Sequence, residues 1–155
     1  MAGRPLAKNI PFAKVEKTGK IGVLMKQKPE FFEVVSPTGL AAATGFLGVV
    51  LGAFGAHGLR ELLTQLGTTA IWEKAVFYHL IHAVMLFFLA ERKPWRALAW
   101  WSFFAGIVCF SGSLYLLAVT NMRWLGAVTP LGGVSFLVGW GALWRKGAGG
   151  GATGV

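Results

Sequence analysis

"ALAWWSFFAGIVCFSGSLYLLAV", residues 97–119, is a run of 23 residues without a single charged side chain. A helix needs about 20 predominantly apolar residues to cross the ~30 Å hydrocarbon core of a bilayer. Strand edges left unpaired cannot be satisfied in lipid, so a helix is the structure expected for such a run. This stretch alone therefore predicts a membrane span.

Three more uncharged runs lie on either side of it, at residues 38–56, 75–90 and 125–144. The second run is short, and it can borrow the turn "IWEK" in front of it if Glu73 and Lys74 sit at the interface. The chain is therefore predicted to be all-α, a polytopic membrane protein with a four-helix bundle spanning about 38–56, 71–90, 97–119 and 125–144. Tryptophans mark the span ends, as in an interfacial aromatic belt: Trp72, Trp95, Trp100, Trp101, Trp124 and Trp144.

Composition agrees with a membrane protein of one domain. Hydrophobic residues make up 55% of the 155 residues and charged residues 14%, against about 25% charged residues in an average soluble protein. We divide the chain into a basic arm (1–37), a transmembrane domain (38–144) and a glycine-rich tail (145–155). The arm has no apolar core of 7–15 residues, which argues against a secretory signal peptide. It is a weak candidate presequence, and the presence of Met1 argues against a cleaved one. Cys109 stands alone, which excludes an intrachain disulfide and a cysteine metal cluster.

The distribution of basic residues predicts the orientation. With four spans, the arm, the loop 91–96 and the tail share one side, and they hold seven, three and two Lys and Arg residues. The other side holds only Arg60, Lys74 and Arg123. The positive-inside rule then places both termini on the cytoplasmic or matrix face. The net charge of +9 is explained by this topology and by anionic lipids rather than by nucleic-acid binding.

Small residues form stripes on three of the expected helices. Such stripes let membrane helices approach closely, and they predict a tight bundle without a wide channel or a large cofactor cavity. The stripes are Gly45, Gly48, Gly52, Gly55 and Ala56 in the first span, Ser102, Gly106, Cys109 and Ser113 in the third, and Gly126, Thr129, Pro130, Gly133 and Trp140 in the fourth.

A short interfacial helix is expected between the first two spans. Leucines at 59, 62, 63 and 66 follow the i, i+3, i+4, i+7 spacing of an amphipathic helix. Gly67 would end this helix, and Thr68 or Thr69 could cap the second span.

Two histidines interrupt the second span in "YHLIHA", residues 78–83. His79 and His82 share a stripe with Ala75 and Leu86, with Tyr78 beside it, while the opposite face is wholly apolar. Both imidazoles should therefore point into the bundle. We favour interhelical hydrogen bonding; haem or metal ligation and proton or quinone handling are the alternatives. The expected hydrogen-bond partners are Ser111, Ser113, Tyr115 and Thr129, and His57 is the remaining histidine that could approach His79.

Five motifs occur in order along the chain: "GAFGAHGL" (52–59), "YHLIHA" (78–83), "FSGSLYLLA" (110–118), "TPLGG" (129–133) and "GW" (139–140). Over residues 39–144 the chain resembles the small family that includes transmembrane protein 256 and its bacterial relatives, a domain of unknown function. The resemblance implies a four-helix membrane protein and carries no catalytic role. The arm and the tail are longer than is usual in that family. The positions that match its signature are Gly55, His57, Gly58, His82, Gly112, Pro130, Gly132 and Gly133.

An enzyme is not expected, because the spans hold no carboxylate pair, no nucleophile–base pair and no phosphate loop. Three hypotheses remain: an accessory subunit of a larger membrane complex, a small carrier, and a haem or metal protein using His79 and His82. We favour a non-catalytic supernumerary subunit of a mitochondrial inner-membrane respiratory assembly, with a bacterial plasma membrane as the alternative location. A glycine-rich tail has few side chains with which to dock on its own bundle, so the arm and the tail are expected to contact other subunits. Phospholipids are expected to fill the seam, and no cofactor is expected.

Overall fold

The computed structural model describes residues 36–147. Those residues form helices and turns, with no strand among them. The contacts expected for the arm and the tail concern residues that lie almost wholly outside this range. Helix α3 begins at Pro37, the last residue assigned to the arm. Helix α8 runs to Gly147, three residues into the range assigned to the tail.

Within residues 36–147, four helical segments are long and apolar enough to cross a membrane, as predicted. The first is α3 (Pro37–Ala56), and the second is α5 (Thr69–Glu91), which begins two residues earlier than expected. The third consists of α6 (Ala97–Gly106), the π-helical turn η1 (Ile107–Ser111) and α7 (Gly112–Thr120). The fourth enters through the 3₁₀ turn η2 (Arg123–Ala127) and continues as α8 (Thr129–Gly147).

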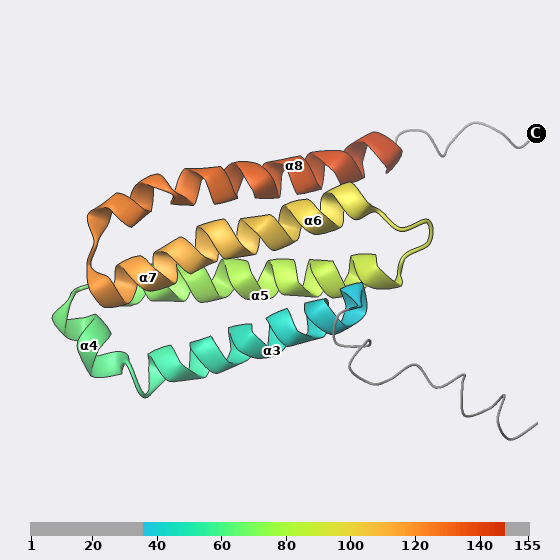
Figure 1. The fold of residues 1–155 in the computed structure, drawn as a ribbon. Coiled ribbons are helices and arrows are strands. Elements are labelled where there is room, and N and C mark those ends of the chain that lie inside the picture. The colour runs from blue at the N-terminus through green and yellow to red at the C-terminus, as the bar shows by residue number, and fades with distance from the viewer. Residues whose placement is uncertain (1–35, 148–155) are drawn as a thin grey trace, which may run out of the picture.

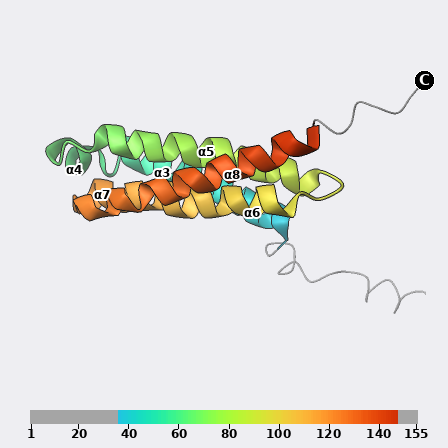
Figure 2. The same ribbon diagram turned by 90° about the horizontal axis from the view of Figure 1, so that it is seen from above.

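The four spans form a bundle in which two helices are central and two are flanking. α5 and the third span lie side by side in the middle, while α3 and α8 cover opposite sides of this pair (Figures 1 and 2). Among the spans α3 packs mainly against α5, and α8 packs against α6, η1 and η2. The loop between α5 and α6 contains a cis peptide bond between Lys93 and Pro94.

Glycines hold α3 close to α5. A Cβ atom at Gly48 would stand 2.8 Å from Cδ2 of Leu80, and one at Gly55 would overlap the indole of Trp72. A Cβ atom at Gly52 would meet Val76 at 3.3 Å. These three glycines confirm the stripe predicted for the first span, because close backbone approach is what brings membrane helices into dispersion contact. Gly45 does not belong to the contact, since a Cβ atom there would meet nothing within 4 Å.

The contact between the third span and α8 also uses glycines, but not on the predicted face of the fourth span. The residues of η2 and α8 that are buried are Leu125, Gly132, Phe136 and Gly139. The predicted face is confirmed only in part: Thr129 bonds to Ser113 and the indole N–H of Trp140 reaches His82, whereas Pro130 is exposed. The aromatic ring of Phe136 decides the register, because it lies directly against Gly106.

The π turn η1 alters the face of the third span. A π-helix closes i→i+5 hydrogen bonds, which widens the turn and changes the direction of the residues within it, such as Cys109. Gly106 and Ser113 are buried as predicted, whereas Ser102 and Cys109 are only half-buried. The buried stripe passes instead through Ile107 and Ser111 to Tyr115.

Two of the tryptophans expected at the interface belong to the core. Trp72 and Trp100 are buried, and their indole Nε1 atoms donate hydrogen bonds to the carbonyls of Leu51 and Leu86, both at 3.1 Å. The first bond joins α5 to α3 and the second joins α6 to α5. A buried indole N–H usually needs such a hydrogen-bond partner. The other four span-end tryptophans, Trp95, Trp101, Trp124 and Trp144, are exposed as the belt requires.

The helix between the first two spans is present as α4 (Arg60–Gln65). Leu63 is fully buried beneath it, and Gly67 follows with a φ of 66°, a conformation that glycine adopts without strain. The predicted threonine cap is correct in position, but the side chain makes no capping hydrogen bond. Thr68 occupies the N-cap position of α5, but its hydroxyl donates to the carbonyl of Ala118 at 2.7 Å and ties this corner to α7 instead.

Candidate functional site

The two histidines of α5 are turned into the bundle. His79 and His82 expose 3% and 4% of their surface, which confirms that both imidazoles leave the lipid face. Tyr78, beside them, is partly exposed. The opposite face of the helix is exposed and apolar, as predicted, at Phe77, Ile81, Val84 and Phe88.

His79 joins three helices through its two ring nitrogens. Its Nε2 lies 3.0 Å from the carbonyl oxygen of Thr44 on α3, and its Nδ1 lies 3.2 Å from the hydroxyl of Tyr115 on α7. A carbonyl can only accept, so Nε2 carries the proton and donates to Thr44. In the neutral ring, which is the form that costs least in an apolar span, Nδ1 accepts from the hydroxyl of Tyr115, and neither nitrogen has a free lone pair.

His82 serves the other side of the bundle. Its Nδ1 lies 2.8 Å from the carbonyl oxygen of Tyr78, so by the same argument Nδ1 carries the proton. Its Nε2 accepts a hydrogen bond of 3.4 Å from the indole Nε1 of Trp140 on α8. The ring also stacks on Phe136, with centroids 3.6 Å apart and planes 10° apart.

The two histidines therefore face opposite flanking helices and do not converge on one site. His79 binds α5 to α3, whereas His82 binds α5 to α8. His57 is exposed at the end of α3, and the structure does not bring it to His79. Within residues 36–147, no three His, Cys, Asp or Glu side chains gather to hold a metal ion.

Of the four predicted partners of the histidines, only Tyr115 is confirmed. The hydroxyl of Ser113 bonds instead to Thr129 and to the carbonyl of Phe110, each at 3.0 Å. Ser111 is fully buried, and its hydroxyl has no hydrogen-bond partner in the structure. The carbonyl of Thr44 was missed because a backbone acceptor leaves no signal in the sequence.

The partner of His82 was also missed, although a signal for it existed. Trp140 belongs to the "GW" motif and had been placed on the inward stripe of the fourth span. Its ring is partly exposed, yet its indole N–H reaches inward to His82. An indole N–H in a membrane span has few acceptors, and the nearby imidazole was one of them.

An apolar hollow of about 370 Å³ opens between α3 and the third span, beside His79. Leu40 and Leu47 of α3 face Phe104 and Val108 across it, and Gly112 lies on its wall. Gly112 does not mark a helix contact, because a Cβ atom there would meet nothing within 4 Å. Both ring nitrogens of His79 are already bonded, so this hollow presents an apolar wall rather than a polar site.

The remaining signature positions have different surroundings. Gly58 lies in the exposed turn after α3, where a Cβ atom would make ordinary contacts with Phe54 at 3.4 Å. A Cβ atom at Gly133 would meet Phe110 at 4.0 Å, which is also ordinary contact. Gly132 is different, since a Cβ atom there would collide with the backbone of Phe110. Close packing therefore accounts for Gly132 but not for its neighbour.

Residues 51–133, which run from the middle of α3 into α8, match the family described as "Protein of unknown function (DUF423)". The chain belongs to the DUF423 family. This match includes both histidines of α5, the helix α4 and Gly132 of α8, which touches the third span. It agrees with the resemblance drawn from the five sequence motifs.

Two bacterial relatives show the extent of the similarity to other DUF423-type chains. The UPF0382 membrane protein YwdK of Bacillus subtilis (strain 168) is 48% identical over 107 residues, which cover 65% of this chain and 86% of the relative. A UPF0382 membrane protein of Staphylococcus epidermidis (strain ATCC 12228 / FDA PCI 1200) is 45% identical over 105 residues, covering 65% and 85%. No solved structure matches the chain. With its four apolar helices, this DUF423 member is an integral, multi-pass membrane protein.

Proposed function

We propose that this protein is a non-catalytic accessory subunit that packs against a larger assembly in the membrane. The main support for this proposal is that both ring nitrogens of His79 and of His82 are hydrogen-bonded within the fold. The imidazoles of the span thus serve to hold helices together, and no polar group of theirs is left for substrate or cofactor. A protein whose intramembrane polar groups serve packing acts through its surfaces.

The partner is proposed to dock on α3. This helix has α5 as its main neighbour among the spans, whereas α8 packs along α6, η1 and η2. The side of α3 turned away from the bundle carries large apolar residues, including Phe46 and Phe54. A partner docked on this surface raises the native mass of the protein, whereas lipid alone does not.

The membrane is proposed to be a bacterial plasma membrane. The relatives described above are bacterial, and they give no support to the expected mitochondrial inner membrane. We propose that the larger assembly is a respiratory complex of this plasma membrane, and it is the first partner to test. The two termini are proposed to lie on the cytoplasmic side, on the charge distribution alone.

Haem or metal binding by His79, His82 or His57 is not favoured by the geometry. A ligating histidine must offer a nitrogen lone pair to the metal, and the two buried rings already use theirs as hydrogen-bond acceptors. An absorption spectrum and a metal analysis of the purified protein test this alternative. A Soret band or a stoichiometric metal that is lost in His79→Gln or His82→Gln would contradict the packing role.

The test of the accessory role compares native masses. The protein, expressed at its natural level, is solubilised in a mild detergent and run on a native gel beside respiratory complexes. We expect a band far larger than a monomer, which Phe46→Ala with Phe54→Ala shifts to low mass. Leu137→Ala with Val134→Ala is the matched control on α8, because the two pairs have nearly the same exposure, 73% and 56% against 71% and 56%. Migration of the parent as a monomer would overturn the proposal.

A further inference from the structure

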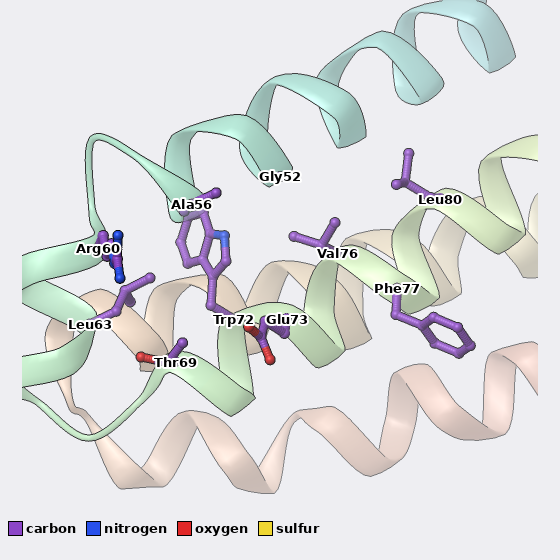
Figure 3. A pocket seen from close by; sticks show the side chains of 11 residues that line it. Gly52, Ala56, Arg60, Leu63, Thr69, Trp72, Glu73, Val76, Phe77 and Leu80 are labelled. Atoms are coloured by element: carbon purple, nitrogen blue, oxygen red, sulfur yellow. The ribbon is translucent and has the colours of Figure 1, made fainter.

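An amphiphilic groove begins at the junction of α3, α4 and α5. A hollow of about 540 Å³ lies there, with Gly52 and Gly55 on its α3 side and Val76 and Leu80 on its α5 side. Figure 3 shows Val76 and Leu80 pointing from α5 toward α3, with Trp72 standing between the two helices. Gly52 and Gly55 pack directly on Val76 and Trp72, and the hollow opens beside this close contact.

The groove continues toward the middle of the membrane. A second hollow of about 340 Å³ follows the same seam and shares Leu80 with the first. It is lined by Gly45 and Val49 of α3 and by Ala83 and Val84 of α5. From Glu73 to Val84 a helix rises about 16 Å, which is close to half of the ~30 Å hydrocarbon thickness. The length of the seam therefore suits one acyl chain of one leaflet.

Two charged side chains stand at the wide end of the groove. Arg60 of α4 and Glu73 of α5 both line the first hollow, and both are exposed. In the part of the chain that the structure describes, neither forms an ion pair with another side chain. Figure 3 shows them on either side of Trp72, whose indole N–H is already bonded to Leu51. A cation and an anion are thus presented separately at the level of the lipid headgroups.

We propose that this groove binds a zwitterionic phospholipid whose headgroup carries a primary ammonium. The planar guanidinium of Arg60 binds the phosphate, since its forked N–H donors match phosphate oxygens. The carboxylate of Glu73 accepts hydrogen bonds from the ammonium, and one acyl chain lies along the seam past Leu80. Phosphatidylethanolamine has this combination of groups.

The charge pair selects against an anionic lipid such as phosphatidylglycerol. Its phosphate would meet Arg60 equally well, but its uncharged glycerol gives Glu73 no cation, and the two negative charges repel each other. The charged end of the site lies within one copy of this chain and needs no partner protein, although Phe46 of the proposed docking face also lines the inner hollow.

The experiment is native mass spectrometry of the full-length protein in detergent, titrated with phosphatidylethanolamine and phosphatidylglycerol of matched acyl chains. We expect phosphatidylethanolamine to bind more tightly. Arg60→Gln should weaken both lipids about tenfold, as the loss of a charge-assisted hydrogen bond implies. Glu73→Gln should weaken phosphatidylethanolamine alone and so abolish the selectivity. Arg123→Gln is the control, because this arginine lies outside the hollow on the turn η2 at the same end of the bundle.

A second pair of variants tests the acyl path. Gly45→Leu places a side chain in the inner hollow, where a Cβ atom meets nothing within 4 Å, so folding should be unaffected. It should weaken a long-chain phosphatidylethanolamine and leave a short-chain one unchanged. Gly141→Leu is the control, since a Cβ atom there also meets nothing within 4 Å but lies on α8. Equal binding of the two lipids by the parent protein, or binding insensitive to Arg60→Gln and Glu73→Gln, would overturn the proposal.

Discussion

Replacing Gly132 by alanine should separate α8 from the third span. The added Cβ atom would stand 2.6 Å from Cβ and 2.7 Å from Cα of Phe110, and it would also overlap the backbone nitrogen of that residue. Ordinary contact begins near 3.4 Å. The obstacle is backbone rather than the end of a flexible side chain, so the two helices must move apart locally by about 1 Å.

The cost follows from that displacement. Overpacking a close contact costs about 1–3 kcal/mol, and the better helix propensity of alanine returns up to about 1 kcal/mol. We therefore expect Gly132→Ala to lower the free energy of unfolding by about 1–2 kcal/mol. The shift also moves Phe110, whose ring lies 4.7 Å from Tyr78 and 5.6 Å from Phe136.

The adjacent glycine supplies the control. A Cβ atom at Gly133 would meet only Cδ2 of Phe110, at 4.0 Å, so Gly133→Ala should be neutral or slightly stabilising. Reversible unfolding by dodecyl sulfate in mixed micelles, followed by far-ultraviolet circular dichroism, measures both variants against the parent. If Gly132→Ala unfolds at the same detergent fraction as Gly133→Ala, the close backbone contact does not exist as described.

Three more predictions follow from other contacts. Tyr115→Phe removes the hydrogen-bond donor to Nδ1 of His79. In the same unfolding assay it should lower the free energy of unfolding by about 0.6 kcal/mol, and by no more than about 1.7 kcal/mol. A larger loss would mean that the hydroxyl does more than join two helices. Thr68→Val keeps the shape but removes a buried bond of 2.7 Å to α7, so about 0.5–1.5 kcal/mol should be lost, and an unchanged midpoint would contradict that bond. In a Cys-free background, a cysteine at Thr120 should react with a membrane-impermeant maleimide added outside intact cells, while one at Gly150 should not; the reverse labelling would invert the topology.

The spans were predictable because membrane insertion depends on hydropathy summed over about 20 residues. The inward direction of His79 and His82 was predictable too, since the apolar face of α5 left them one side to occupy. The stripe of Gly48, Gly52 and Gly55 belongs to the same class, because small residues in a span have few other uses.

The predictions that were wrong concerned which residues of a span face inward and which side chains pair with each other. The π turn at Ile107–Ser111 has no sequence signature, so the half-buried position of Cys109 within it was not predicted. Trp72 and Trp100 were assigned to the interface because span-end tryptophans usually lie there, yet carbonyls on neighbouring helices were available to them. His82 and Trp140 were both predicted to face inward, but they lie 58 positions apart, and the sequence does not say which inward groups meet.

The two histidines also set an order for biosynthesis. His79 meets the carbonyl of Thr44, a residue made before it, so this bond can form as soon as the first hairpin enters the bilayer. His82 must wait for Trp140, made 58 residues later, and until then its Nε2 has no partner on another helix. A ribosome that stops before α8 therefore leaves one unsatisfied imidazole facing hydrocarbon, a mark by which membrane quality control could distinguish an unfinished chain from a complete one.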